Sequence, residues 1–341
     1  MKSAIGALCI AVAICPTLHS IKINVETIER KPNPHAIDTQ KYAQQKAIAR
    51  NTPKIVGLVP VRNEAAYIDQ CLRALACYTD AIVVLDDAST DTTIEIVQAL
   101  AKSCAIERII TKKTWHRDEP GDRNKLLQAG RSIGGTHFIV IDADEMLTAP
   151  CLKNNYLRTK ILAMQPGQQM RLNWITLWGS LNTFRADRLY IKNCIFCDDG
   201  ISYYTSNFIH TFRVPENLSL PEKNPEVIDL DDHLSYGLLH FEAANPINML
   251  IKRAWYKCLE RIRTKVPARE INKKYFSQLP KPPLAQSHAN WFAYNFFDAR
   301  PYNAQETWRT KQVKHWFNQY GRDYFADLTI WHIDWDAGIA I

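Results

Sequence analysis

The stretch THFIVIDADE, residues 136–145, decides how the chain is expected to fold. Its apolar run, residues 138–141, is too short for a buried helix and is typical of a central strand. The run ends in Asp142, Asp144 and Glu145, three carboxylates that repel one another unless a cation or solvent compensates them. At the carboxyl end of a parallel strand they would face the crevice in which open α/β sheets bind ligands. The alternative interpretation is an ordinary acidic turn.

The residues upstream of this stretch alternate between strands and helices. Apolar, β-branched runs predict three strands: residues 54–61, 81–85 and 107–111. Apolar positions at helical spacing predict the intervening helices: one after residue 64, one after a capping box of Thr92 and Glu95, and one over residues 124–133. A polar loop is expected over residues 114–121. The alternation predicts an α/β fold, with a doubly wound, mostly parallel sheet and helices on both faces.

Polar turns follow three of these strands: Arg62-Asn63-Glu64, Asp86-Asp87 and Asp142-Ala143-Asp144. Because the carboxyl ends of parallel strands meet at one edge of a sheet, we expect the three turns to lie close together. Three such turns predict a binding crevice, whereas one would be ordinary. Hard oxygen ligands at this edge suit Mg²⁺ or Mn²⁺ that carries a substrate phosphate.

The second half of the chain is less regular. Residues 171–183 alternate like an antiparallel strand, and residues 238–242 predict a short strand with His240 and Glu242 on one face. Residues 291–335 are rich in aromatic side chains and predict a helical layer packed on the core. A platform for sugar rings is the alternative interpretation of these aromatic residues.

A helix is expected to begin at Pro246, capped by Asn245, and to carry a full apolar stripe. Four basic residues lie off that stripe: Lys252, Arg253, Lys257 and Arg261. They predict a solvated face of the helix, with contact to acidic lipid or to a diphosphate as the alternative.

The composition is that of a globular protein, with 46% hydrophobic and 23% charged residues among 341. The net charge of +7 favours an anionic partner, namely a nucleotide, a phosphorylated substrate or an acidic membrane surface. The basic residues are scattered and form no nucleic-acid motif, so nucleic acid is not an expected partner. Among nine cysteines, Cys194 and Cys197 form one CxxC without a second pair, which indicates a structural or incidental role rather than a zinc site.

The N-terminus has the order of a secretory signal. Lys2 precedes an apolar run over residues 4–15, which is too short for a standard membrane span, and small Ser20 closes the segment. The polar residues 24–52 are typical of a linker.

Four segments, LVPVRNEAAYIDQCL, VVLDDASTDTT, GDRNKLLQAG and FIVIDADE, occur in this order and together resemble the family 2 glycosyltransferases. The resemblance covers about residues 54–147 and is weaker beyond them. It implies a GT-A fold, a nucleotide-sugar donor, a glycan, lipid or protein acceptor, and Mg²⁺ or Mn²⁺ as cofactor. Ala88 departs from the pattern, since many members have glycine there, but the change removes no functional group.

On this resemblance the chain is expected to divide into five parts: a signal-like or anchor segment (1–20), a linker (21–52), a nucleotide-sugar-binding half (53–150), a smaller α+β acceptor half (151–245) and a helical C-terminal region (246–341).

The resemblance also implies roles for individual residues. Those that fall at nucleotide-binding positions are Pro60, Arg62, Asn63, Glu64, Asp86, Asp87, Arg123 and Asp142. Asp87 would bond the base, Asp142 would contact ribose or metal, and Asp144 would bind the metal directly. His240 would add a late metal ligand, with an ordinary core or surface histidine as the alternative.

An inverting member of this family needs a carboxylate base for the acceptor hydroxyl. Asp199, in the turn CDDG, is the expected base, with Asp198, Asp232 and Glu242 as alternatives. Two other functions stay open. A nucleotidyltransferase on a similar sheet would need a glycine-rich loop after its first strand, and the segment PVRNEAAY at that place contains no glycine. A non-catalytic glycan- or nucleotide-binding relative is the other.

Because nucleotide sugars are made in the cytosol, an exported enzyme would be separated from its donor. We therefore expect residues 1–20 to be retained as an anchor, with the catalytic domain on the cytosolic side of a membrane. The basic residues between Lys252 and Arg261 would add attraction to an acidic leaflet. Export after cleavage of a signal is the alternative.

Overall fold

The computed structural model describes residues 52–187, 190–205, 210–216, 218, 226–227, 236–275, 277, 281–292, 308–337 and 339–340. The expected signal-like segment and linker, as well as Asp232, lie outside the described residues. Within those ranges, every helix is too short or too polar to cross a membrane.

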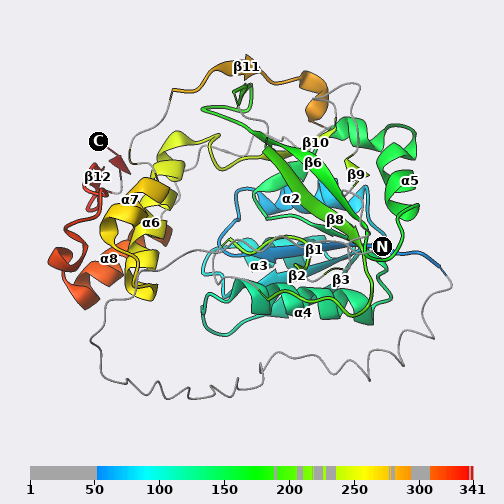
Figure 1. Cartoon of the computed structure of the whole chain (residues 1–341), viewed down its shortest axis with the longest axis horizontal. Coiled ribbons are helices and arrows are strands. Elements are labelled where there is room, and N and C mark those ends of the chain that lie inside the picture. Colours follow the sequence, from blue (N-terminus) through cyan, green and yellow to red (C-terminus); the bar gives the residue numbers. More distant parts are fainter. Residues whose placement is uncertain are drawn as a thin grey trace, which may run out of the picture. The chain divides into compact units, whose positions relative to one another are not determined.

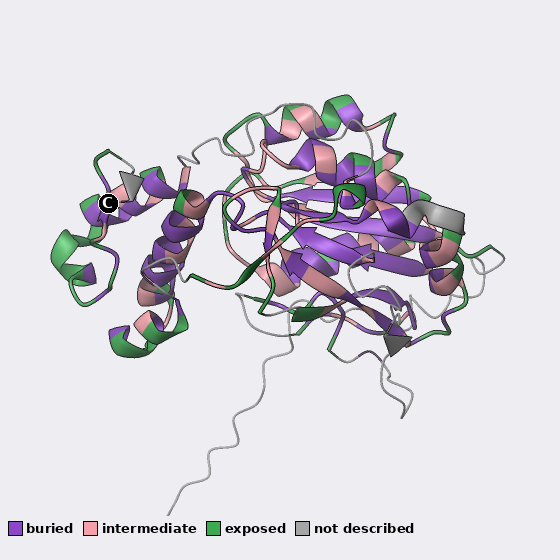
Figure 2. Cartoon of the chain, turned by 90° about the horizontal axis from the view of Figure 1, so that it is seen from above, coloured by how far each residue is buried: buried purple, intermediate pink, exposed green. Residues whose placement is uncertain are grey.

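Four parallel strands form one side of the central sheet, in the order β3-β2-β1-β4 (Figure 1). Their bounds are β1 (Ile55–Val61), β2 (Ala81–Asp86), β3 (Ile106–Thr111) and β4 (His137–Val140). Leu58 of β1 lies between Val83 of β2 and Val140 of β4. β1, β2 and β4 are almost wholly buried, as expected for a sheet covered on both faces (Figure 2).

The sheet continues beyond β4 in the order β8-β6-β10-β5, with β9 beside β6. These strands are β5 (Glu145–Leu147), β6 (Gln169–Thr176), β8 (Tyr190–Cys197), β9 (Glu226–Val227) and β10 (Gly237–His240). β8 and β5 run antiparallel to their neighbours, whereas β6 and β10 are parallel to each other. The prediction of a mixed α/β fold with a mostly parallel sheet is therefore confirmed. The sheet also joins strands from both sides of the expected boundary at residue 150.

Helices cover both faces of the sheet. α2 (Ile68–Ala76) and α3 (Thr93–Leu100) pack on one face, where Val59, Leu72 and Val97 belong to one core cluster. α4 (Glu119–Ser132) packs on the other, where Leu58 and Leu126 belong to a second cluster (Figure 1). Alternate residues of β1 supply the two clusters, as the strand period of two requires.

Three local predictions were wrong in detail. α4 begins at Glu119 rather than at residue 124, because Asp118 caps it by accepting a hydrogen bond from the Gly121 amide at 3.1 Å. The side chain of Thr92 makes no capping bond to α3. The strand expected over residues 171–183 is two strands, β6 and β7 (Thr183–Arg185), because the chain turns at Gly179, whose φ is +72°.

The remaining elements lie between the sheet and the C-terminus. Their bounds are η1 (Ala149–Asn155), α5 (Tyr156–Leu162), α6 (Pro246–Arg263), α7 (Ala268–Lys274), β11 (Leu284–Gln286), η2 (Ala289–Trp291), α8 (Trp308–Tyr320), η4 (Arg322–Phe325), β12 (Ile333–Asp334) and β13 (Ile339–Ala340). As predicted, Asn245 caps α6, accepting from the amide of Ile247 at 3.0 Å. Helices α6 to α8 share an aromatic core that includes Trp255 and Trp316, as predicted for a helical C-terminal layer. Residues 293–307 of that prediction lie outside the described residues.

The expectation that the basic residues of α6 form one solvated face was wrong. Lys257 is fully buried, and its Nζ donates to the hydroxyls of Ser277 at 2.6 Å and Thr329 at 2.7 Å. Lys252 is also largely buried, and its partners belong to the candidate site below.

Helix α4 approaches the sheet most closely at Gly130. A Cβ atom there would lie 2.5 Å from Cε1 of Phe138 and 3.1 Å from Cδ2 of Leu58. Helix propensity alone would make Gly130→Ala stabilising by about 1 kcal/mol. We predict the opposite, a loss of about 1–3 kcal/mol in the free energy of unfolding, because the added methyl overpacks the core. Urea denaturation measures it, with Ser132→Ala at an exposed position of the same helix as control. A Gly130→Ala protein at least as stable as wild type would contradict the close packing.

Candidate active site

The order of the parallel strands creates a crevice at one edge of the sheet. From β1 the chain continues to β2 and β3 on one side, then returns through α4 to β4 on the other side of β1. At such a switch point the turns after the two central strands diverge and leave room for a ligand. A cavity of about 800 Å³ lies there. Nine carboxylates and eight Lys or Arg side chains line it, so its walls are densely charged but nearly balanced.

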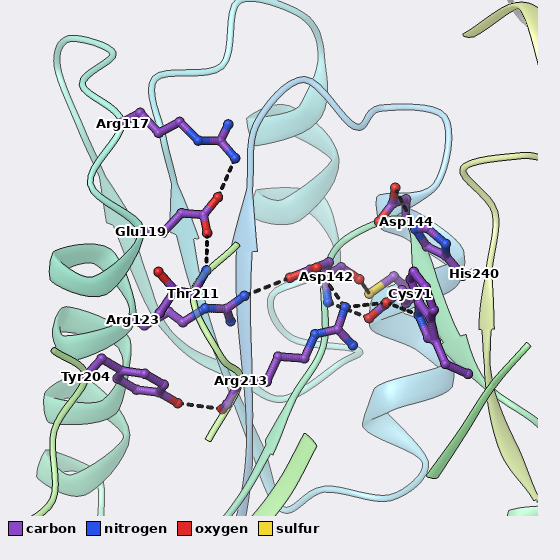
Figure 3. Close-up of polar contacts among 12 residues, drawn as sticks. Cys71, Arg117, Glu119, Arg123, Asp142, Asp144, Tyr204, Thr211, Arg213 and His240 are labelled. Carbon is purple, nitrogen blue, oxygen red and sulfur yellow. Dashed lines mark hydrogen bonds and ion pairs between the residues drawn. The ribbon is translucent and has the colours of Figure 1, made fainter. Parts of the chain in front are cut away.

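Asp142, directly after β4, is held by two guanidinium groups. Arg123 of α4 donates to Oδ1 at 3.2 Å, and Arg213 donates to Oδ2 at 2.8 Å. Figure 3 shows the two arginines reaching Asp142 from different parts of the chain. Burial would raise the pKa of Asp142, but Arg213 and Arg123 outweigh it and lower the pKa below its ordinary value.

Asp144 contacts a lysine and a histidine rather than two arginines. Its Oδ2 lies 3.1 Å from Nζ of Lys252 on α6 and 3.5 Å from Nε2 of His240 at the end of β10. Burial opposes ionisation, yet Lys252 and His240 prevail and hold the pKa of Asp144 well below its ordinary value. The ring of His240 stacks on Trp174 with centroids 4.3 Å apart. Its Nδ1 bonds to no group in the described part of the chain.

Glu145 fixes the turn that carries Asp142 and Asp144. It is 1% exposed, and its Oε2 accepts from the Asp142 amide at 3.0 Å. Its Oε1 accepts from Nε1 of Trp174 at 2.6 Å and also from Arg213. Arg213 therefore bridges Asp142 and Glu145, and these two carboxylates keep its pKa raised although burial acts in the opposite direction. Glu145 is thus a positioning residue for the turn.

Glu242 lies on the same side of the cavity as Asp144. Its carboxylate contacts Arg253 at 2.8 Å and Lys252 at 3.5 Å, both on α6. Burial would raise the pKa of Glu242, but Lys252 and Arg253 lower it to about 2. The predicted strand that carries His240 and Glu242 ends at His240, yet both side chains line the cavity.

The turn after β1 is tied to the turn after β2. Arg62 donates to the backbone carbonyls of Asp87 and Ala88, and its guanidinium lies 5.1 Å from the ring of Trp115 and 5.3 Å from that of Trp308. Ala88 has a φ of +55°, a conformation that glycine would adopt at lower cost. Arg62 therefore fixes the shape of this edge as well as lining it.

Two expected nucleotide-binding residues, Asn63 and Asp86, accept hydrogen bonds from the backbone of the loop after β2. Oδ1 of Asn63 accepts from the Thr90 amide at 2.6 Å, and the carboxylate of Asp86 accepts from the Ser89 amide at 3.2 Å. Neither Asn63 nor Asp86 is among the residues that line the cavity.

Three others, Pro60, Glu64 and Asp87, do line the cavity. Asp87 pairs with Lys112 at 2.5 Å. Glu64 lies 3.7 Å from Arg309 of α8, and burial together with the nearby charge of Asp144 raises its pKa to about 7.

Asp199, the expected base, lies outside the cavity lining. Its Oδ1 accepts from the amides of Ile201 at 2.9 Å and Ser202 at 2.8 Å, and its Oδ2 accepts from the Ser202 hydroxyl at 2.5 Å. Asp198 forms a two-pronged pair with Arg131, at 2.9 and 2.7 Å. The Asp199 carboxylate thus bonds within its own turn, and neither Asp198 nor Asp199 joins Asp142 and Asp144 in the cavity lining.

The residues present fit a divalent cation only with help from a ligand. No group of three or more His, Cys, Asp or Glu among the described residues forms a complete metal site. Asp144 and His240, however, place an oxygen and a nitrogen 3.5 Å apart on the cavity wall. Mg²⁺ is commonly held by one or two side chains plus substrate phosphates and water, and this pair suits that mode.

The sequence prediction missed Arg213 and Lys252, the cations that hold the acidic turn. Arg213 stands in no recognisable motif, and only the requirement that buried acids be compensated signals it. Lys252 was among the basic residues of α6, for which contact with a diphosphate was the alternative interpretation. Its position in the second turn of a helix that is capped just after β10 was the available signal.

Comparisons with known proteins bear on the first half of the chain. The sequence model named Glycosyl transferase family 2 matches residues 58–156, which include both turns that flank the switch point. A search of curated proteins finds no match. Among solved structures, TarS from S. aureus in complex with UDP is 22% identical, over 38% of this chain and 36% of that one, with a TM-score of 0.28.

Two further structures align over similar lengths. The mannosyltransferase PcManGT from Pyrobaculum calidifontis, in complex with GDP-Man and Mn²⁺, is 22% identical over 41% of this chain and 42% of that one, with a TM-score of 0.28. Glucosyl-3-phosphoglycerate synthase from Mycobacterium tuberculosis, with Mg²⁺ and UDP, is 20% identical over 41% and 48%, with a TM-score of 0.27. The chain spans less than half the length of each of these three proteins. Residues 58–156 therefore match glycosyl transferase family 2, the family that the four sequence motifs resemble.

Proposed function

We propose that the protein transfers a sugar from a nucleotide-sugar donor to an acceptor hydroxyl, with both substrates in the charged cavity. One observation carries the proposal. The segment that matches the family contains the turns after β1, β2 and β4, and residues of all three turns line the same cavity. The family match indicates the reaction but does not locate the site. The cavity locates a site but does not indicate the reaction.

The donor's nucleoside would lie over the turns after β1 and β2. Pro60, Glu64 and Asp87 line this part, and the carboxylate of Asp87 can accept a hydrogen bond from a base N–H. The diphosphate would then reach Asp142 and Asp144. Arg123 and Arg213 stand beside it and would donate to its oxygens, because a guanidinium binds phosphate with two parallel N–H groups.

The balance of charge favours a divalent cation in this reaction. Nine carboxylates and eight basic side chains already line the cavity, and a nucleoside diphosphate adds negative charge. Asp144 and His240 would hold Mg²⁺ or Mn²⁺, with phosphate oxygens completing the coordination. Such a cation supplies Lewis-acid stabilisation of the charge that develops on the departing diphosphate.

The acceptor would approach over β6 and β8. Trp174 lies there with Nζ of Lys192 4.3 Å from its ring, and Asn193 adds an amide to the same wall. The ammonium of Lys192 and the amide of Asn193 can donate to sugar hydroxyl oxygens, which favours a glycan acceptor within the expected range of glycan, lipid or protein.

An inverting transfer also requires a carboxylate base beside the acceptor. Of the described base candidates, Asp198, Asp199 and Glu242, the last is the one that lines the cavity, and it does so together with Asp144. Its ion pairs keep it ionised at neutral pH, which is the state that can accept the acceptor's proton. We therefore propose Glu242 as the base in place of Asp199.

Replacing the metal-binding acid tests the reaction class. Asp144→Asn is expected to lower Mn²⁺-dependent release of nucleoside diphosphate by about a hundredfold or more, since the lost stabilisation is several kcal/mol. A panel of sugar nucleotides, assayed with and without EDTA, measures it. Glu95→Gln, at an exposed position of α3, is the control. Full activity of a folded Asp144→Asn protein, as judged by circular dichroism, would exclude the assigned role. Absence of turnover by wild type with every donor and acceptor would favour a binding protein.

Paired variants distinguish the two candidate bases. Glu242→Gln is expected to reduce transfer by about 10²–10⁴-fold, the usual worth of a general base, while calorimetric affinity for UDP or GDP stays close to that of wild type. Asp199→Asn should keep transfer. Arg253→Met is the control for the ion pair, because it removes the cation and leaves the Glu242 carboxylate in place. Loss of transfer in Asp199→Asn with retention in Glu242→Gln would return the role to Asp199.

A further inference from the structure

Lys252 holds the same oxygen that a divalent cation would need. Its Nζ lies 3.1 Å from Oδ2 of Asp144, the oxygen that also faces Nε2 of His240 at 3.5 Å. The side chain of Lys252 is 16% exposed, and those of Asp144 and His240 are less exposed still. A cation of the protein itself therefore compensates Asp144.

An ammonium group and a divalent cation cannot share this oxygen. A metal ligand oxygen lies about 2.1 Å from Mg²⁺, so a metal on Asp144 and His240 would be a near neighbour of Nζ in its present place. Like charges at that separation repel strongly between groups as largely buried as these. Occupation of Asp144 by one cation must weaken its hold on the other.

Lys252 also contacts a second carboxylate, that of Glu242, which can pair with the ammonium group once it leaves Asp144. Oε1 of Glu242 lies 3.5 Å from Nζ, and Glu242 is fixed from its other side by Arg253 at 2.8 Å. A small rotation of the lysine side chain would release Asp144 without leaving the ammonium unpaired. In the new position it would still line the cavity, where the diphosphate oxygens of a donor are a further partner.

We propose that Lys252 is an internal counter-ion that competes with the divalent cation for Asp144 and passes to Glu242 and the donor diphosphate when the cation binds. This inference rests on the proposed function, since it takes Asp144 as the metal-binding acid. It assigns to Lys252 a role in controlling metal affinity, beside the roles proposed for the carboxylates. Metal affinity is low in the empty protein and rises with the donor, so the two ligands bind cooperatively.

Mn²⁺ binding, followed by the electron paramagnetic resonance signal of the free ion, tests the competition without any turnover. Lys252→Met is expected to bind Mn²⁺ about tenfold more tightly than wild type, or better, because the competitor is gone. Addition of UDP or GDP should strengthen Mn²⁺ binding by wild type, and should do so much less in Lys252→Met. Arg253→Met, which removes the other cation paired with Glu242, should bind Mn²⁺ within about twofold of wild type.

Thermal unfolding first establishes that each variant is folded. If Lys252→Met is not, the double variant Lys252→Met/Glu242→Gln replaces it, because it also removes one of the two carboxylates that Lys252 compensates. Equal Mn²⁺ affinities of wild type and the folded lysine variant would overturn the inference. If Asp144→Asn still abolished Mn²⁺ binding in that case, the metal site of the proposed function would stand. If no protein bound Mn²⁺ while donor turnover persisted in EDTA, both the metal site and the counter-ion role would fall, and the transferase activity would remain.

Discussion

The structure depends on compensating three carboxylates that the chain places at the end of one buried strand. Asp142, Asp144 and Glu145 follow β4 within a few residues, and Glu145 is almost completely buried. Leaving such an acid unpaired would cost about 3–5 kcal/mol, a large part of the stability of a domain. The chain meets this constraint with Arg213 and Lys252, which come from the second half of the sequence. These acids thus connect the two halves of the chain, in addition to the roles proposed for them in the chemistry.

The first half of the fold was predictable because its signals are local. Short β-branched runs, helical spacing in residues such as Leu72, and acids at strand ends all lie within one element and its turn. Where the prediction failed there, the start of α4, the reason was also local, since Asp118 caps the helix before its apolar face begins. The gathering of Asp87, Asp142 and Asp144 on one cavity followed from parallel topology alone.

The second half was harder to predict because its partners are distant in sequence. Strand β8, which pairs with β4 and β6, was not predicted, although the turn CDDG begins at its last residue, Cys197. The acidic turn of Asp199 has the composition of a catalytic turn, yet its carboxylate is used by its own backbone, which spacing could not reveal. Glu242 and Lys252 gained their positions only when α6 was placed after β10. Their separation from Asp144, about a hundred residues, carries no periodic signal.

The contact of Arg62 with both Trp115 and Trp308 has a consequence for how this protein could be divided or recombined. Trp115 follows β3, Trp308 begins α8, and both pack against the aromatic cluster around Trp255. A fragment limited to the family-matched residues 58–156 would keep Arg62 and Trp115 and lose Trp308. A chimera that exchanged the C-terminal helices with those of a relative would have to exchange the loop around Trp115 as well. The smallest transplantable piece of this protein is therefore larger than its recognisable domain.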